Sequence, residues 1–279
     1  MNLALMKYDL HSHSHYSDGS LSPAELVEQA IAADISHLAL TDHDSIAGLA
    51  EARLAAQKTT LQLINGVELS CNWRHQLLHV VGLDIDPNNA TLLAGIEQNR
   101  QRRFDRAEAM FEDFEKHDID IRDQVQALIH NDAVPTRPHF ADALVEQGYA
   151  KDKKQAFKRY LVQGKPGFIA MQWPSIDEVG EWVTVSGGIA VLAHPTRYKF
   201  TRSKLIRLIA DMQLAQVHGI EISTAITDQA QESMLSQLAM EHKLLASTGS
   251  DFHSNDQPWA KLGRTRSLSD DLTPVWSRF

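Results

Sequence analysis

Histidines and acidic residues recur along the sequence at spacings that allow two side chains to bind one metal ion. His11 and His13 lie two residues apart, and Asp251 and His253 repeat this spacing near the end of the chain. In an extended segment, residues i and i+2 project from the same face, so both members of such a pair reach the same point. The two pairs therefore favour metal chelation.

Further candidate ligands stand on or just after short apolar segments, as in LTDH, which ends at His43, and AHP, which contains His194. The complete set is His11, His13, Asp18, His43, Glu68, His79, His194, Asp251 and His253. This set exceeds the roughly four to six ligands that one ion accepts, which predicts two or three divalent ions. Nitrogen and oxygen ligands without a thiolate suit manganese, iron or zinc without choosing between them, and we take manganese as the expected metal.

A plainer interpretation treats each histidine as a capping or core residue, and for any single histidine it is the better one. It fails for the set, because nearly all of these residues fall at the C-terminal ends of predicted strands, the edge where parallel barrels build active sites. Histidines before strands or on helices are interpreted as structural: His37, His75, His117, His130, His218 and His242. His15 is left between a structural role and support of a neighbouring ligand.

Short apolar runs alternate with amphipathic stretches in the first and last thirds of the chain. Strands are expected at 8–13, 37–43, 61–69, 77–85, 188–194, 219–223 and 244–251, and helices at 23–33, 46–56, 176–186, 203–214 and 228–242. Ser22, Pro23 and Glu25 mark the first helix start, since they form a capping box with proline at the first helical position. Repeated strand–helix units predict an α/β fold with a mostly parallel sheet, open or closed into a barrel.

Residues 88–165 interrupt this alternation. They predict charged helices at 89–117, 122–129, 138–147 and 153–161, with no convincing strand. We therefore expect a helical insertion, or lid domain, at 98–165 between two parts of one barrel domain, 1–97 and 166–279. The insertion is locally the most basic part of the chain.

The composition limits the classes of function. A formal net charge of −9 argues against a broad basic surface that coats nucleic acid, but it permits a small charged substrate. No apolar stretch approaches the roughly 18 residues of a bilayer span, and the N-terminus lacks a signal-peptide pattern. The single cysteine, Cys71, cannot form an internal disulfide. We expect a cytoplasmic chain without a membrane partner or a stable protein partner.

Five motifs together resemble the PHP (polymerase and histidinol phosphatase) superfamily: the His-x-His start, TDH ending at His43, GVE ending at Glu68, AHP around His194, and GSDFH ending at His253. The resemblance extends from Lys7 to about Gly263. It implies a distorted (β/α)7 barrel with a trinuclear metal site. In that site His11, His13, Glu68 and Asp251 hold one ion, Glu68 bridges to a second held by His79 and His194, and Asp18, His43 and His253 hold the third.

Such a site suits hydrolysis of phosphate esters. Closely spaced divalent ions lower the pKa of a bridging water, supply hydroxide near neutral pH and stabilise the attacking and leaving oxygens of an in-line displacement at phosphorus. No protein nucleophile is required. The ions also allow an acidic chain to accept an anionic substrate, because they set the local charge.

The insertion adds candidate phosphate-binding residues. RRFDR supplies Arg102, Arg103 and Arg106 on one predicted helix, and TRPHF opens another helix with Arg137 and His139. Arginine suits bidentate phosphate binding, and a helix N-terminus adds donors and a favourable dipole. An arginine-rich helix alone more often faces solvent.

Together with Gln172-Trp173 and the closing Ser-Asp-Phe-His, these segments resemble the TrpH-like branch of the superfamily, also called RNase AM. That branch implies a 3′,5′-nucleotide bisphosphate phosphatase and 5′→3′ exoribonuclease that acts on nucleotides or short RNA. The implied substrate-binding residues are Asp18, His43, Arg102, Arg103, Arg106, Arg137 and His139, and which arginines contact phosphate is left open.

Other functions remain to be weighed. Phosphatase activity on AMP or other mononucleotides is a close alternative, and histidinol phosphatase shares the barrel and metals but does not need an arginine-lined lid. A polymerase-associated proofreading domain is disfavoured, because no polymerase segment follows Phe279. A metal-binding module without turnover is also disfavoured, since all nine ligand positions are occupied.

Overall fold

A seven-stranded sheet lies at the centre of the computed structural model, which describes residues 6–130 and 133–279. Its strands are β1 (Tyr8–Asp9), β2 (His37–Leu40), β3 (Gln62–Trp73), β4 (Gln76–Leu83), β5 (Ile189–Leu192), β6 (Val217–Ser223) and β7 (Leu245–Thr248), and they neighbour one another in chain order. The end of β7 meets the segment after β1, because the N–H of Leu10 donates to the carbonyl of Thr248 at 3.0 Å. The predicted distorted α/β barrel with seven strands and a helical insertion is confirmed.

The sheet departs from a parallel arrangement at β4, which pairs antiparallel with both β3 and β5. The sequence predicted a third strand over 61–69 with Glu68 at its end, but β3 continues to Trp73 and Glu68 lies in its interior. A two-residue turn joins β3 to β4, with Arg74 and His75 both at positive φ, 44° and 66°. This is the backbone of a tight hairpin turn, yet Arg74 and His75 stand where an Asn-Gly or Asp-Gly pair usually marks one.

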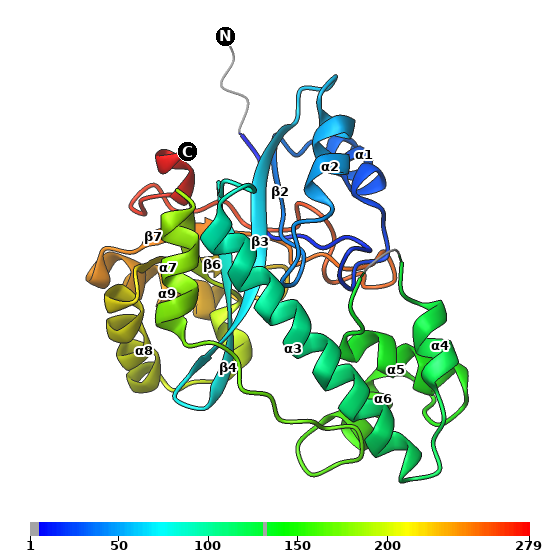
Figure 1. Ribbon diagram of the computed structural model, residues 1–279. Helices are drawn as coiled ribbons and strands as arrows, with labels where there is room; N and C mark the ends of the chain where they lie inside the picture. The colour runs from blue at the N-terminus through cyan, green and yellow to red at the C-terminus, as the bar shows by residue number, and fades with distance from the viewer. Residues whose placement is uncertain (1–5, 131–132) are drawn as a thin grey trace.

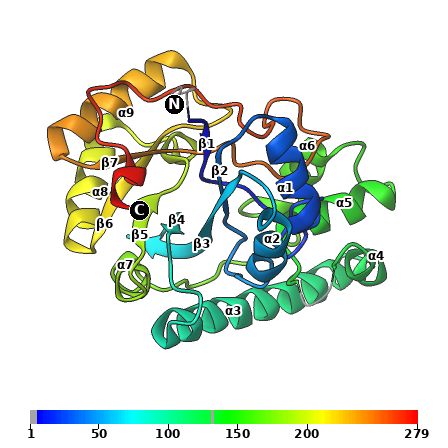
Figure 2. The same cartoon turned by 90° about the horizontal axis from the view of Figure 1, so that it is seen from above.

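Helices surround the barrel, as Figure 2 shows. They are α1 (Pro23–Ala32), α2 (Leu49–Ala56), α7 (Ile176–Val185), α8 (Arg202–Leu214) and α9 (Gln229–His242), with short 3-10 helices at Pro195–Tyr198 and Val275–Arg278. The capping box predicted at the start of α1 is present: the N–H of Ser22 donates to Glu25 at 2.8 Å, and the N–H of Glu25 donates back to the Ser22 hydroxyl at 3.2 Å.

The insertion lies beside the barrel rather than around it (Figure 1). It contains α3 (Ala90–Glu115), α4 (Arg122–Ala127), α5 (Arg137–Glu146), α6 (Lys153–Ala156) and a π-helix at Phe157–Leu161. The sequence predicted one helix over 153–161, whereas the structure divides this segment into α6 and the π-helix.

Helix α3 belongs to both the barrel and the insertion. Its first turns bury Leu92 and Ile96 in the barrel core with Trp182 of α7, while its last turns bury Phe111 and Phe114 in a separate core within the insertion. Gly95 allows the close approach to α7, because a Cβ atom there would lie 2.3 Å from the Trp182 ring. The domain boundary expected between residues 97 and 98 falls inside this continuous helix, and the division into domains stays a prediction.

The C-terminal segment packs against the start of the barrel. The ring of Trp276 stacks on that of Tyr8 with centroids 4.0 Å apart, and Val275 is fully buried. Among the helices in residues 6–130 and 133–279, none combines the length and apolarity needed to cross a membrane.

Candidate active site

The candidate ligands converge at one edge of the barrel. His11 and His13 follow β1, His43 follows β2, and His194 follows β5. The loop after β7 carries Asp251 and His253. His79 reaches the same edge from the first half of β4, because an antiparallel strand starts where its neighbours end. It lies opposite Ser70 in β3.

The first group of ligand atoms brings together residues from both ends of the chain. The Nε2 atoms of His11 and His13 lie 3.1 Å apart, which shows that both rings face one point. Oδ1 of Asp251 lies 3.5 Å from His11 Nε2 and 3.3 Å from His13 Nε2. Each of these imidazoles also has a Glu68 oxygen at 3.4 Å. All four side chains are buried.

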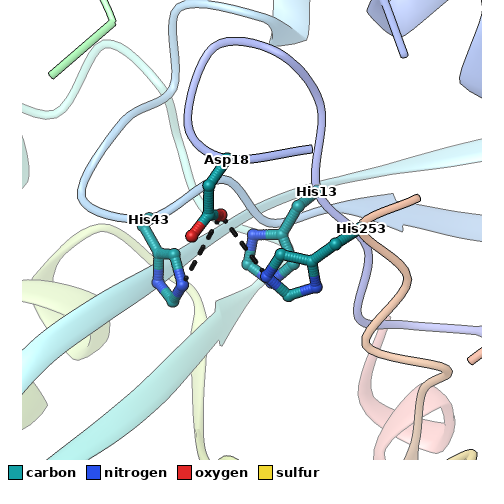
Figure 3. Close-up of side chains that lie close together, drawn as sticks. All are labelled: His13, Asp18, His43 and His253. Atoms are coloured by element: carbon teal, nitrogen blue, oxygen red, sulfur yellow. Dashed lines mark ion pairs between the residues drawn. The ribbon is translucent and has the colours of Figure 1, made fainter. Parts of the chain in front are cut away.

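A second group surrounds Asp18 (Figure 3). Oδ1 of Asp18 lies 3.3 Å from Nε2 of His253 and 3.8 Å from Nε2 of His43. His13 contributes a ligand atom within 4.8 Å of the others, so this group comprises three imidazoles and one carboxylate.

Glu68 occupies the centre of the cluster. Its Oε1 lies 3.0 Å from both Nδ1 of His79 and Nε2 of His194. Its Oε2 lies 2.7 Å from Nδ1 of His43, but the two atoms are not aligned for a hydrogen bond. One carboxylate thus faces imidazoles from several strands.

Several buried polar atoms of the cluster have no hydrogen-bond partner: Asp18 Oδ1, His43 Nδ1, Glu68 Oε2 and His194 Nδ1. A buried carboxylate oxygen or imidazole nitrogen without a partner is expensive unless it binds a cation. Convergent nitrogen and oxygen atoms without thiolates fit divalent metal ions, so these residues suit a metal centre.

The charge states also suit ligands. Burial lowers the pKa of His13 to about 3 and that of His79 to about 4, which keeps both imidazoles neutral near pH 7. Burial alone would raise the pKa of Glu68, but nearby imidazoles hold it well below its usual range. Burial opposes ionisation of Asp251 as well, and Arg197 overcomes it. Ligands must be deprotonated to bind metal, and these four are.

Two residues that sequence reasoning missed support the ligands directly. Glu221 of β6 accepts a hydrogen bond from Nδ1 of His11 at 2.7 Å and from the N–H of His194 at 2.6 Å. This leaves Nε2 of His11 facing the cluster. Arg197 forms an ion pair with Asp251. An acidic residue inside an otherwise apolar strand is the signal that could have revealed Glu221.

Buried aspartates anchor the loops that carry ligands. Asp42 accepts from the N–H of Ser14 at 2.8 Å and from the hydroxyl of Ser17 at 2.6 Å, which fixes the turn before Asp18. Asp9 accepts from the N–H of Ser250 at 2.7 Å, directly before Asp251. Asp251 itself has φ of 54°, an uncommon conformation for a residue other than glycine.

A small cavity of about 50 Å³ joins the ligand cluster to the insertion. Its walls combine Asp18, His43 and His79 with Arg103, Arg106, Arg137 and Trp173, among others. Arg102 and His139 lie outside this lining. Arg102 faces Asn99, and Nδ1 of His139 accepts a hydrogen bond from the N–H of Thr136 at 3.1 Å. The phosphate-binding role expected for these two residues stays a prediction.

The arginines differ in their partners. Nε of Arg103 lies 2.6 Å from Asp44, whose Oδ1 also accepts from Asn99 at 2.7 Å. Arg106 is buried, yet its Nε has no partner. Burial and the neighbouring guanidinium groups of Arg103 and Arg137 lower its pKa to about 9, so it remains charged near pH 7. A buried cation without an acidic partner is suited to bind an anion.

The sequence profile of the PHP domain family matches residues 9–225. The chain belongs to the PHP family. It is 39% identical to 3′,5′-nucleoside bisphosphate phosphatase of Chromobacterium violaceum, over 96% of this chain and 94% of that protein. It is 41% identical to a 5′-3′ exoribonuclease of Haemophilus influenzae, over 98% and 99%, and 40% identical to the 5′-3′ exoribonuclease Rnm of Escherichia coli, over 96% and 92%.

Solved structures agree with this placement. A Chromobacterium violaceum protein described as an amidohydrolase, with bound sulfate and no metal, superposes with a TM-score of 0.91 at 39% identity, over 96% of this chain and 94% of that one. A Bifidobacterium adolescentis protein assigned as a metal-dependent phosphoesterase gives 0.83 at 28% identity, over 98% and 96%. This PHP-family chain is an enzyme that hydrolyses phosphate esters.

Proposed function

We propose that the chain removes the 3′-phosphate from nucleoside 3′,5′-bisphosphates and releases 5′-mononucleotides from the 5′ end of short RNA. One observation carries this proposal: a ligand cluster and an arginine-lined cavity adjoin one another. A substrate with two phosphate groups engages both at once, whereas a monophosphate engages only one. The names of the similar proteins from three bacteria agree with this substrate class.

The two activities require the same bond to break. In a bisphosphate and in RNA alike, phosphorus parts from the O3′ atom of the first nucleotide, whose 5′-phosphate stays free. We assign the reacting phosphate to the ligand cluster and the 5′-phosphate to Arg103, Arg106 and Arg137. The buried, unpartnered Nε of Arg106 supports this assignment, since phosphate oxygens would satisfy it.

The nine clustered histidines and carboxylates are proposed to hold two or three divalent ions, with manganese as the expected metal. When bound, such ions acidify water and neutralise charge on the phosphoryl oxygens. Glu221 accepts from Nδ1 of His11, which leaves Nε2 as the atom that would bind metal, and Arg197 keeps Asp251 ionised. Near pH 7 the imidazoles of His13 and His79 are already neutral. Against the effect of burial, carboxylates raise the pKa of His11 well above its usual value and that of His253 to about 9, so these two lose a proton when they bind metal. A cytoplasmic location suits the single free cysteine, which is buried.

The test measures phosphate release from adenosine 3′,5′-bisphosphate, AMP and histidinol phosphate, with manganese and then with a chelator. The expected result is a chelator-sensitive preference for the bisphosphate, with AMP as the product. Arg137→Ala should raise KM for the bisphosphate while bound metal is unchanged. The matched control is Arg122→Ala, which removes a lid arginine that pairs with Glu108 at the surface. A preference for histidinol phosphate would refute the assignment of the arginines.

A further inference from the structure

A second cavity, of about 680 Å³, lies next to the arginine site. The two cavities share Leu77, Arg106, Arg137 and Trp173 in their walls. A ligand whose phosphate contacts Arg106 and Arg137 therefore has this larger space directly beside that phosphate. Its volume falls within the range of about 300–1,000 Å³ typical of sites for small organic ligands.

The walls of the larger cavity suit a flat, amphipathic group. Met110, Ile169 and Leu77 supply apolar surface, and Asn72 and Gln172 supply polar groups. No acidic side chain lines the cavity in the described part of the chain, so an anionic nucleotide is not repelled. A nucleobase combines an apolar face with a polar edge, and it matches such walls.

The loop at residues 167–174 forms one wall of this cavity and is fixed at both ends. At its start the N–H of Gly167 donates to Asp113 of α3 at 2.8 Å, and at its end Pro174 accepts from the N–H of Asn72 in β3 at 2.7 Å. Gly167 has φ of 79°, and a Cβ there would lie 2.2 Å from the Phe114 ring, so the loop packs tightly on α3. The cavity is thus preformed rather than assembled by the ligand.

The backbone between these anchors offers N–H donors to a ligand. Within the described residues, the N–H groups of 169–172 donate to no protein group, although these residues line the cavity. Backbone donors can meet acceptors on the edge of any base. Together with apolar contact, they favour binding of a base without strong discrimination among bases.

We propose that this cavity binds the nucleobase of the nucleotide whose 5′-phosphate contacts the arginines. The inference rests on the proposed function and adds a base subsite to it. Because of this subsite, nucleotides bind more tightly than phosphorylated alcohols that lack a base. All four bases are accepted. The measurable consequence is that removing the base weakens binding without slowing the chemical step.

The test fills the cavity with Ala170→Trp, since Ala170 lines it and is exposed. KM for adenosine 3′,5′-bisphosphate should rise about five- to 150-fold, the loss expected when a base-stacking contact disappears, with kcat unchanged. The abasic 1-deoxyribose 3,5-bisphosphate should keep its wild-type KM. Gln172→Trp provides a second filling variant, and Ala90→Trp, an exposed alanine at the start of α3, is the control.

Each outcome decides one question. Equal KM increases for the nucleotide and the abasic substrate, or none, would overturn the subsite. A loss confined to substrates that carry an ester on the 5′-phosphate would also overturn it, because the cavity would then hold that substituent. Failure of the proposed function is distinct, since the wild-type enzyme would then release no phosphate from any bisphosphate.

Discussion

Arg103 and Arg106 form a natural matched pair for testing the arginine site. Both are buried on successive turns of α3, and both guanidinium groups lie 5.4 Å from the Trp173 ring centroid. Only Arg103 has an acidic partner, because Asp44 lies 2.6 Å from its Nε. In the part of the chain that the structure describes, no carboxylate lies within ion-pair distance of Arg106. Replacing each arginine by methionine removes one positive charge in both cases, but the effect on the stability of the folded protein should differ.

The Arg106→Met substitution should reduce activity without reducing stability. A hydrogen bond to a charged phosphate contributes about 1.5–3 kcal/mol, and each 1.4 kcal/mol is about tenfold, so kcat/KM for the bisphosphate should fall about ten- to 150-fold. The free energy of unfolding should rise by about 1 kcal/mol or more, because a buried cation without a partner carries a desolvation penalty that methionine avoids.

The Arg103→Met substitution should instead destabilise the protein. It leaves the buried carboxylate of Asp44 without its cation, and breaking a buried pair in this way costs about 3–5 kcal/mol. Burial would raise the pKa of Asp44, yet Arg103 holds it below the usual value. The remaining donors to Asp44, from Ser70 and Asn99, do not supply a charge.

The assays are urea unfolding of the metal-depleted proteins and initial rates of phosphate release from adenosine 3′,5′-bisphosphate. AMP serves as the reference substrate, since with one phosphate it does not engage both sites. If Arg106→Met destabilises as much as Arg103→Met and leaves kcat/KM unchanged, the reasoning is refuted. Arg106 would then be a structural cation and not a phosphate-binding group.

The ligand cluster, the single thiol and the lid core each give a further expected outcome. Glu68→Gln should lower bound metal and abolish phosphate release, as measured by elemental mass spectrometry and product assay; full activity with unchanged metal would contradict its role. Cys71 is fully buried and burial raises its pKa, so a maleimide should label it only after unfolding. Labelling of the folded chain would argue against this burial. Phe140→Ala should lower the free energy of unfolding by about 3–5 kcal/mol in urea, because Phe140 is fully buried in the lid core; a loss under 1 kcal/mol would mean that the lid core relaxes.

The sequence predicted those features of the site and fold that depend on residue type and short-range spacing. The His11 and His13 pair converges on the cluster as an i, i+2 spacing predicts. Asp251 and His253 converge as well, although the positive φ of Asp251 shows that their segment is not extended. The capping box at Ser22 was equally readable, since its two hydrogen bonds depend only on local sequence. Ligand roles for these residues stay predictions until metal binding is measured.

Other features depend on tertiary contacts that leave no local signal. The direction of β4 is set by the turn at Arg74 and His75, two residues that do not normally mark a hairpin. Asp44 has no distinctive spacing, yet its position across from α3 decides which arginine is neutralised. Glu221 lies 210 residues from the His11 side chain that it orients.

Helix α3 is continuous from the barrel to the lid, so its length sets where Arg103 and Arg106 lie relative to the ligand cluster. Each residue of an α-helix turns by about 100°, so one residue inserted between Ile96 and Arg103 would rotate both arginines away from the cluster. An insertion of seven residues would nearly restore their direction but move the lid outward by about 10 Å. In this chain a change in the length of α3 would therefore alter the position of the arginines without altering any metal ligand.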